Sequence, residues 1–268
     1  MEDMSLPLVQ IIGLNVQYVT SAGHAPIAVN DVDLCINAAE IVGLIGESGS
    51  GKSTLASAIM RLLPHTAKAV GKILFDGSDL LSMREHELLK VRGRRMSMIP
   101  QDPAVCLNPV LRAGTQISEV LRAHWRLNRK ERKQRVLELL VEVGFGDPEA
   151  IASAYPHQLS GGQRQRVVIA QAIACQPDLV IADEPTSKLD SPLQAQILTL
   201  MSAIARRHST ALLWITHDPA SLAGFADRVA VMYRGQIVEE GNSIFTRPAH
   251  AYTKKLMESA AEFALALL

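Results

Sequence analysis

The chain has 268 residues, 48% of them hydrophobic and 20% charged, and its 27 Lys and Arg residues balance 27 Asp and Glu residues. These values are typical of a folded α/β protein, with material for one large domain or two small ones. The zero net charge gives no strong attraction to nucleic acid. No apolar run approaches the roughly 18 residues that span a bilayer, and Glu2 and Asp3 replace the basic start of a secretory signal. The sequence therefore predicts a cytoplasmic protein that does not bind nucleic acid.

Alternating apolar residues open the chain. Leu8 to Thr20 and Ala28 to Ile36 alternate with the period of two that is typical of half-buried strands. Lys72 to Phe75 continues this pattern and is followed by an Asp76-Gly77 turn. Together these segments predict an antiparallel sheet.

The next segment is an apolar run, Ile41 to Ile45, that reads as a buried parallel strand. A helix is predicted over Thr54–Leu63 and is ended by Pro64. The nine residues that connect strand and helix fit the phosphate-binding pattern G-x-x-x-x-G-K-[ST]; they are Gly46, Glu47, Ser48, Gly49, Ser50, Gly51, Lys52, Ser53 and Thr54.

The residue types of this loop suit a phosphate ligand. Its glycines let successive backbone N–H groups turn inward, and the helix that follows adds the positive end of its dipole. Lys52 would reach the β- and γ-phosphates, and the Ser53 hydroxyl would ligate Mg²⁺. The loop therefore predicts binding of a nucleoside triphosphate. Tyr18, 28 positions before Gly46, either packs within its strand or stacks on the base of that nucleotide.

The middle of the chain is predicted to be a helical insertion. A short parallel strand, Met96 to Ile99, delivers Gln101 at its C-terminal end, where ligands gather in open α/β sheets. From Pro103 to about His157 the pattern is helical. The strongest helix runs from about Arg129 to Val143, with a capping box at its start and Gly144 as its C-cap. Its many charges are interpreted as a solvated face.

A second glycine-rich helix start follows at Leu159 to Gln163. Ser160 is a good N-cap, and Gly161 and Gly162 expose backbone N–H groups at the beginning of the helix. Gln163 completes the five-residue stretch and leads into the helix. The stretch predicts a second anion-binding helix terminus.

Two later strands end in polar residues. Leu179 to Glu184 is apolar until its two carboxylates, so Asp183 is a candidate Mg²⁺ ligand and Glu184 a candidate for orienting or deprotonating an attacking water. A surface acidic pair is the alternative interpretation. Ala211 to Thr216 is another buried strand, and the His217 that follows is favoured as a γ-phosphate contact over a structural histidine. A hairpin over residues 229–239 closes the pattern.

The order of these motifs resembles the ATP-binding subunit of ABC (ATP-binding cassette) transporters over essentially the whole chain. The pentapeptide Leu159–Gln163 is highly specific to that superfamily. The resemblance implies an α/β fold with a P-loop NTPase core of mainly parallel sheet, an antiparallel β-subdomain and an inserted α-helical subdomain. It divides a single domain, 1–268, into a core with the β-subdomain (1–101), a helical subdomain (102–158), the rest of the catalytic core (159–240) and a helical tail (241–268).

The resemblance also implies roles and partners. Two cassettes, in a homo- or heterodimer, would sandwich each ATP between the phosphate loop of one and Ser160–Gln163 of the other. Tyr18 would stack on adenine, Gln101 would sense Mg²⁺ and the membrane subunit, and Glu184 would be the catalytic base. Asp190 would communicate across the dimer. Two integral membrane permeases would complete the transporter at the cytoplasmic face of the inner membrane, with one coupling helix received by residues 100–114 and an extracytoplasmic substrate-binding protein as an indirect partner.

Several stretches are similar to the peptide and nickel importer group within this superfamily. They include Gln101–Pro103, Leu107–Pro109, Tyr155–Leu159 and Ala195–Leu198. The sequence favours nickel or a metal chelate only slightly over peptides. Lys188 departs from the family, which usually has a small residue there; it would either alter coupling between the two ATP sites or point to water.

Two other classes remain as alternatives. A soluble ABC ATPase of DNA repair, chromosome structure or translation would need a long coiled coil or a second cassette, and this sequence has neither. A plain P-loop kinase or GTPase would leave Leu159–Gln163 unexplained.

Overall fold

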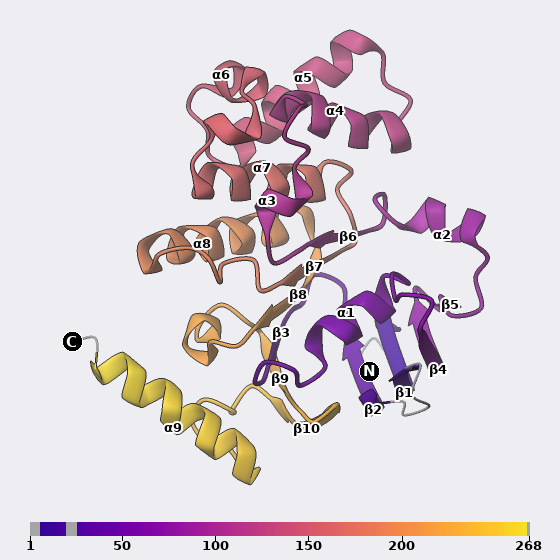
Figure 1. The fold of residues 1–268 in the computed structure, drawn as a ribbon, viewed down its shortest axis with the longest axis vertical. Coiled ribbons are helices and arrows are strands. Elements are labelled where there is room, and N and C mark those ends of the chain that lie inside the picture. The colour runs from indigo at the N-terminus through magenta and orange to yellow at the C-terminus, as the bar shows by residue number, and fades with distance from the viewer. Residues whose placement is uncertain (1–5, 20–25, 267–268) are drawn as a thin grey trace, which may run out of the picture. The chain divides into compact units, whose positions relative to one another are not determined.

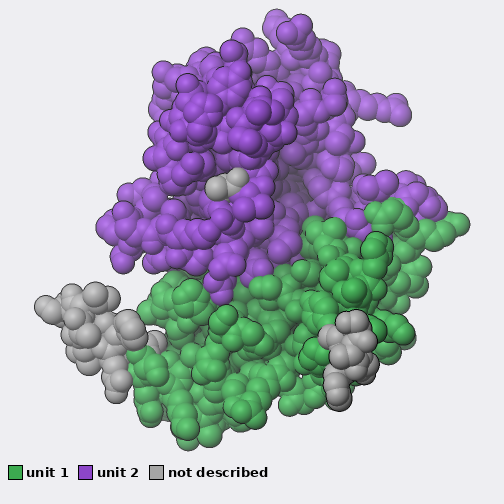
Figure 2. Space-filling model, viewed as in Figure 1, with its two compact units in different colours: residues 1–85, 211–268 green, residues 86–210 purple. Residues whose placement is uncertain are grey.

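The structure is a computed structural model, and it describes residues 6–19 and 26–266. The N-terminal Glu2 and Asp3 therefore lie outside the described part. The chain forms two compact units: unit 1 contains residues 1–85 and 211–268, and unit 2 contains residues 86–210 (Figure 2). Within the described ranges no helix is long and apolar enough to cross a membrane.

Unit 1 contains the expected antiparallel sheet, in the order β2-β1-β4-β5. Its strands are β1 (Val9–Tyr18), β2 (Ile27–Ile36), β4 (Ala67–Phe75) and β5 (Ser78–Asp79). The apolar residues that alternate along β1, among them Val9, Ile11 and Leu14, are buried. One face of the sheet therefore packs into a core, as the period of two predicted.

Unit 1 also contains four strands of a second, mainly parallel sheet, and one of them leads to the phosphate loop. β3 (Ile41–Ile45) pairs in parallel with both β8 (Ala211–Thr216) and β9 (Arg228–Tyr233). β9 forms an antiparallel hairpin with β10 (Gln236–Gly241). The helical elements of this unit are α1 (Lys52–Ile59), η2 (Pro219–Leu222) and α9 (Ala251–Ala266) (Figure 1). All residues of β3 and β8 are buried, which explains their continuous apolar runs.

Unit 2 is mainly helical around a pair of parallel strands. β6 (Met96–Ile99) pairs with β7 (Leu179–Asp183). The helical elements are α2 (Glu85–Val91), α3 (Pro103–Cys106), α4 (Ala113–His124), α5 (Arg129–Glu142), α6 (Pro148–Ser153), η1 (Pro156–Gln158), α7 (Gly161–Ile173) and α8 (Ser191–His208). α4, α5 and α6 pack on one another as a cluster (Figure 1). The predicted helical insertion is therefore present.

Helix boundaries differ from the expected ones at two places. α1 begins at Lys52 rather than Thr54, directly after Gly51, and ends at Ile59. The end comes early because Arg61 turns into the left-handed region, with φ of 54°. α5 has the predicted capping box, but its C-cap is Val143, and Gly144 follows with φ of 89°.

The three cysteines are free thiols: Cys35 and Cys106 are exposed, and Cys175 is buried. Burial raises the pKa of the Cys175 thiol to about 11. That thiol is therefore neutral at physiological pH.

Candidate functional site

The phosphate loop connects β3 to α1 through two glycines that no other residue could replace without strain. Gly46 has φ of 155°, and a Cβ there would lie 2.1 Å from the Met232 carbonyl oxygen. Gly51 has φ of 111°, and a Cβ there would lie 2.3 Å from the Ala28 carbonyl oxygen. Both obstacles are backbone atoms, which cannot move aside as a side chain can. The loop thus lies tightly against β9 and β2.

Lys52 folds back over the loop. Its Nζ donates hydrogen bonds to the carbonyl oxygens of Gly46 at 2.7 Å and Glu47 at 2.9 Å, and to Ser50 Oγ at 3.4 Å. The residue is only 4% exposed. The ammonium group is therefore held inside the curve of the loop, with carbonyl oxygens compensating much of its desolvation. Ser53, in the first turn of α1, is exposed.

Two tyrosines contact the ends of this loop. The Tyr18 hydroxyl lies 3.2 Å from Thr54 Oγ1, so the half-buried ring of Tyr18 lies near the start of α1. The Tyr252 hydroxyl accepts a hydrogen bond from the Glu47 backbone N–H at 2.9 Å. The Tyr252 ring stacks on Tyr233, with centroids 4.1 Å apart. Burial raises the pKa of the Tyr252 hydroxyl, so it stays a neutral acceptor.

Sequence reasoning did not find Tyr252. It lies on α9, 205 residues after its hydrogen-bond partner. No motif in the sequence pointed to it, because its contact with the loop depends on how α9 packs.

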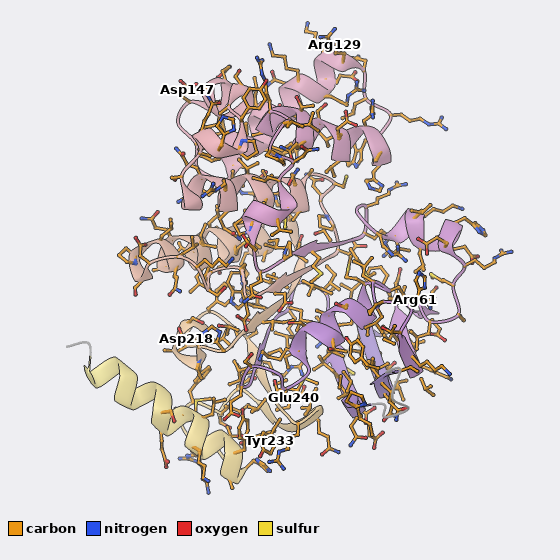
Figure 3. The ribbon with its side chains drawn as sticks, in the orientation of Figure 1. Arg61, Arg129, Asp147, Asp218, Tyr233 and Glu240 are labelled. Atoms are coloured by element: carbon orange, nitrogen blue, oxygen red, sulfur yellow. The ribbon has the colours of Figure 1, made fainter. Side chains whose placement is uncertain are left out.

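His217 lies at the same sheet edge as the phosphate loop. The parallel register pairs Ile45 with Thr216, so Gly46 and His217 each follow the last residue of neighbouring strands. His217 is exposed, and Asp218 after it caps η2 by accepting from the Ala220 N–H at 3.0 Å (Figure 3). The predicted convergence of His217 and the loop at one edge is present in unit 1.

Unit 2 has a corresponding edge. The parallel register pairs Ile99 with Ala182, so Asp183, the last residue of β7, and Gln101, two residues after β6, lie at neighbouring strand ends. Gln101 Nε2 donates a hydrogen bond of 3.0 Å to Glu184 Oε2. Asp183 is buried, and Glu184 has φ of 47°, a region that non-glycine residues rarely occupy. The strand therefore ends in a sharp turn that separates the directions of the two carboxylates.

The turn after Glu184 is internally bonded. Ser187 donates from its backbone N–H and its hydroxyl to the Glu184 carbonyl oxygen, at 3.2 and 3.0 Å. Lys188 forms an ion pair with Asp102, the neighbour of Gln101 in the chain. Asp190 caps α8 by accepting from the Leu193 N–H at 3.0 Å. Lys188, expected either to alter coupling or to point to water, thus has a partner within its own unit.

The stretch Leu159–Gln163 begins α7 as predicted, with Ser160 as N-cap. Ser160 Oγ accepts from the Gln163 N–H at 3.2 Å, and Gln163 Oε1 accepts from the Ser160 N–H at 2.9 Å. A Cβ on Gly162 would lie 2.5 Å from Leu193 Cδ2, whereas one on Gly161 would meet nothing within 4 Å. Gly162 thus allows α7 to approach α8, while the backbone at Gly161 is open to an incoming ligand.

The structure brings the predicted residues together as two groups. Unit 1 holds Tyr18, the whole loop and His217. Unit 2 holds Gln101, Asp183, Glu184 and residues 160–163, and Gln101 and Gly161 line one cavity of about 250 Å³.

The sequence pattern of the ABC transporter family matches residues 29–187. The oligopeptide transport ATP-binding protein OppD of Bacillus subtilis is 45% identical over 256 residues, which cover 94% of this chain and 71% of OppD. The peptidoglycan transport ATP-binding protein YejF of Agrobacterium fabrum is 47% identical over 260 residues, which cover 96% of this chain. The chain spans about half, 47%, of the length of YejF.

Solved structures agree with this assignment. The dimeric ATP-binding cassette MJ0796, in a post-hydrolysis state bound to ADP and Pi, superposes with a TM-score of 0.78 at 30% identity, over 87% of this chain and 98% of that one. CbiO1 of Clostridium perfringens, part of the ABC transporter complex cbiONQ, superposes with a TM-score of 0.76 at 25% identity, over 98% of this chain and 96% of that one. The expected ABC ATPase fold is confirmed, and the chain belongs to the ATP-binding cassettes of the ABC transporter family.

Proposed function

We propose that this chain is the ATP-hydrolysing subunit of an ABC importer for peptides. The observation that carries the proposal is its 45% identity to an oligopeptide transport ATP-binding protein over 94% of the chain. The relatives described above are named for transport, so the DNA-repair and translation alternatives have no support among them. Their names also give no support to the slight preference for nickel, and we therefore place peptides first.

In this proposal the loop Gly46–Thr54 binds the phosphates and Tyr18 stacks on the adenine. The inward-held ammonium of Lys52 would exchange its carbonyl contacts for β- and γ-phosphate oxygens, which are stronger acceptors because they are charged. The contact of Tyr18 with the beginning of α1 supports its role, because it holds the ring beside the loop.

Mg²⁺ suits the oxygen donors among these residues. Ser53, Gln101 and Asp183 offer a hydroxyl, an amide carbonyl and a carboxylate, which are hard oxygen ligands of the kind Mg²⁺ takes. The burial of Asp183 is consistent with a carboxylate whose charge is to be compensated by a cation. When bound, Mg²⁺ would neutralise charge on the β- and γ-phosphates.

Glu184 would orient and deprotonate the attacking water, and His217 would contact the γ-phosphate. The hydrogen bond from Gln101 holds one oxygen of the Glu184 carboxylate and so orients the proposed base. Because Gln101 lies within the segment proposed to meet the permease, movement of that segment would change the position of the base.

The proposed assembly has two cassettes and two permeases. Ser160–Gln163 of one cassette would complete the nucleotide site of the other, a role supported by the exposed backbone at Gly161. The second cassette is either another copy or a related chain. Residues 100–114 would receive a permease coupling helix at the cytoplasmic face of the inner membrane, and an extracytoplasmic binding protein would deliver the peptide.

A reconstituted complex with Glu184→Gln tests the catalytic proposal. We expect ATP binding to persist while hydrolysis falls by about two orders of magnitude or more, because the water loses its base while phosphate contacts remain. Near-normal turnover would remove Glu184 from that role. Glu119→Gln serves as a matched control that exchanges a carboxylate for an amide at an exposed position on α4, outside the proposed catalytic residues.

The substrate class is tested in the same complex. The complex would be isolated from membranes through a tag on this chain, and its ATPase rate measured with the binding protein loaded with oligopeptides or with a nickel chelate. Stimulation by peptides alone supports the proposal. Stimulation by the nickel chelate alone would reassign the substrate, and purification with ribosomes or DNA in place of membrane proteins would reject the transporter.

A further inference from the structure

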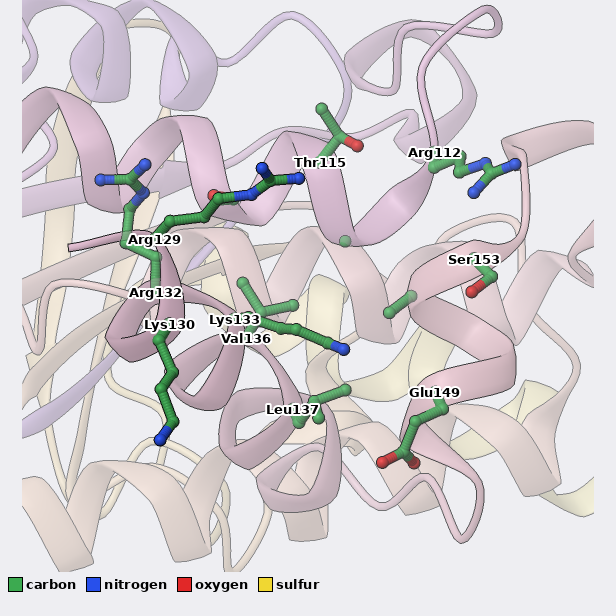
Figure 4. Close-up of a pocket in the computed structure, with 13 residues that line it drawn as sticks. Arg112, Thr115, Arg129, Lys130, Arg132, Lys133, Val136, Leu137, Glu149 and Ser153 are labelled. Atoms are coloured by element: carbon green, nitrogen blue, oxygen red, sulfur yellow. The ribbon is translucent and has the colours of Figure 1, made fainter. Parts of the chain in front are cut away.

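A cavity in unit 2 lies among α4, α5 and α6. Its volume is about 840 Å³, within the range of small-molecule sites. Figure 4 shows Arg129, Lys130 and Arg132 on one side of it and Arg112, Ser153 and Glu149 on the other.

The charges that line this cavity are almost all positive. The five cations are Arg112, Arg129, Lys130, Arg132 and Lys133, and the one acidic residue is Glu149. The hydroxyls of Thr115, Ser118 and Ser153 add neutral hydrogen-bonding groups, and Val136 and Leu137 form an apolar part. Arginine forks, ammonium groups and hydroxyls on a partly apolar wall are the groups that bind phosphate esters.

Most of these cations are not paired with carboxylates. Within the described ranges, no ion pair joins Arg129, Lys130 or Lys133 to an acidic group, Glu149 included. Arg132 donates from Nη1 to the Leu127 carbonyl oxygen at 2.5 Å, but its Nε is buried and has no hydrogen-bond partner among the described residues. A buried donor without an acceptor is rare and costs free energy. Because Nε itself is shielded from solvent, Arg132 would offer a ligand its outer guanidinium nitrogens.

The position of the cations on α5 is unfavourable for the helix itself. Four of them lie within its first five residues, where the helix dipole favours anions. Arg129 lies three residues before Arg132 and four before Lys133, at spacings that bring like charges together on one face. The backbone N–H groups of Lys130 and Glu131 are already capped by Asn128. An anion would thus be bound by the side chains, and it would relieve their mutual repulsion.

We propose that this cavity binds a small soluble ligand that carries two or more phosphate groups, at a site separate from the phosphate loop. Five cations against one carboxylate match a ligand of several negative charges, and a volume of about 840 Å³ suits a small molecule. Arg129 and Lys133 form charge-assisted hydrogen bonds to the phosphates, and the serine and threonine hydroxyls add neutral ones. The exposed cations that the sequence assigned to a solvated face would, in this proposal, also bind a ligand.

Inorganic tripolyphosphate is a suitable probe. Its binding would be measured by calorimetry on the full chain carrying Lys52→Ala, because this substitution weakens binding of the probe to the phosphate loop. We expect one tripolyphosphate per chain. Arg129→Gln with Lys133→Gln should weaken its binding by about tenfold or more, because two charge-assisted hydrogen bonds are lost. Arg129→Lys alone, which keeps the charge, should retain most of the affinity. Glutamine is a good helix former, so circular dichroism should show the double variant folded.

The matched control is Lys254→Gln with Lys255→Gln on α9, which removes the same charge from exposed positions outside this cavity. It should leave binding unchanged. Absence of tripolyphosphate binding, or an equal loss in the control, would overturn the proposal. The proposal would also be overturned if the chain bound phosphatidylglycerol vesicles in preference to phosphatidylcholine vesicles but did not bind tripolyphosphate. The occupant would then be a lipid surface.

Discussion

Replacement of Lys188 by alanine breaks an ion pair that joins two segments around the proposed catalytic base. Lys188 follows Glu184 by four residues, and its partner Asp102 directly follows Gln101. Gln101 is in turn hydrogen-bonded to Glu184. The two contacts therefore form parallel connections between the same two segments. We expect Lys188→Ala to loosen Gln101 and to lower the transport achieved per ATP hydrolysed.

The size of the effect follows from exposure. The side chains of Lys188 and Asp102 are 59% and 31% exposed, so water and salt screen much of their attraction. Exposed ion pairs contribute about 0.2 to 1 kcal/mol, which corresponds to a factor of about 1.5 to 5 in an equilibrium or rate constant. The effect should therefore be a modest change in coupling, and loss of hydrolysis is not expected.

A double-mutant cycle isolates this pair. Asp102 has a further interaction besides Lys188, so Asp102→Ala alone overstates the contribution of the pair, and the cycle subtracts the excess. Urea unfolding and the transport-to-ATP ratio would be measured for both single variants and the double variant. The Arg135–Glu138 pair on α5, also part-exposed, provides a control cycle. A coupling energy of zero with an unchanged ratio would refute the reasoning and make Lys188 a bystander.

Four further substitutions test the phosphate loop and the start of α7. Lys52→Ala should weaken ATP binding by about 10- to 100-fold in calorimetry, since a charge-assisted contact is lost; an unchanged affinity would reject the phosphate-loop assignment. Tyr252→Phe removes the hydrogen-bond acceptor of the Glu47 amide but keeps the ring stack on Tyr233. Urea unfolding should therefore show a free energy of unfolding lower by about 0.5 to 1 kcal/mol. A larger decrease would mean that the hydroxyl has a second role. Gly162→Ala should cost about 0.5 to 1.5 kcal/mol, because the half-buried Leu193 side chain must shift to another rotamer. Gly161→Ala, which meets nothing, should cost less, and equal thermal shifts would contradict this packing.

Local patterns predicted those parts of the fold that depend on neighbours in the chain. The Asn128–Glu131 capping box on α5 and the N-cap at Ser160 are present because both are satisfied within one helical turn. β3 and β8 were found because strands buried on both faces read as continuous apolar runs. The start of α1 was predicted two residues too late, because the loop already ends at Gly51. The conformation of Gly51 depends on its close approach to the backbone of Ala28, which the local sequence does not reveal.

The site was predicted where motif spacing alone determines it and missed where tertiary contacts do. The register of parallel strands brings His217 to the edge of the phosphate loop, as their positions at strand ends implied. The fold-back of Lys52, the Lys188–Asp102 pair and the Tyr252 contact depend on rotamers and on segments distant in sequence. The charges of α5 were interpreted from one helix alone, and only its packing with α4 and α6 turns them toward a common cavity.

Salt should distinguish the two phosphate sites, because the residues that form them differ in burial. Lys52 is 4% exposed and is held by loop carbonyls, whereas Arg129, Lys130 and Lys133 are exposed. Screening reaches exposed charges: the Debye length falls from about 10 Å at 0.1 M salt to about 3 Å at 1 M, while buried groups are screened much less. Across that range, tripolyphosphate binding to the α4–α6 cavity should weaken by a larger factor than ATP binding to the phosphate loop. Equal salt slopes for the two ligands would mean that the cavity holds its ligand through buried groups, with Arg132 as the main contact, and that the exposed cations contribute little.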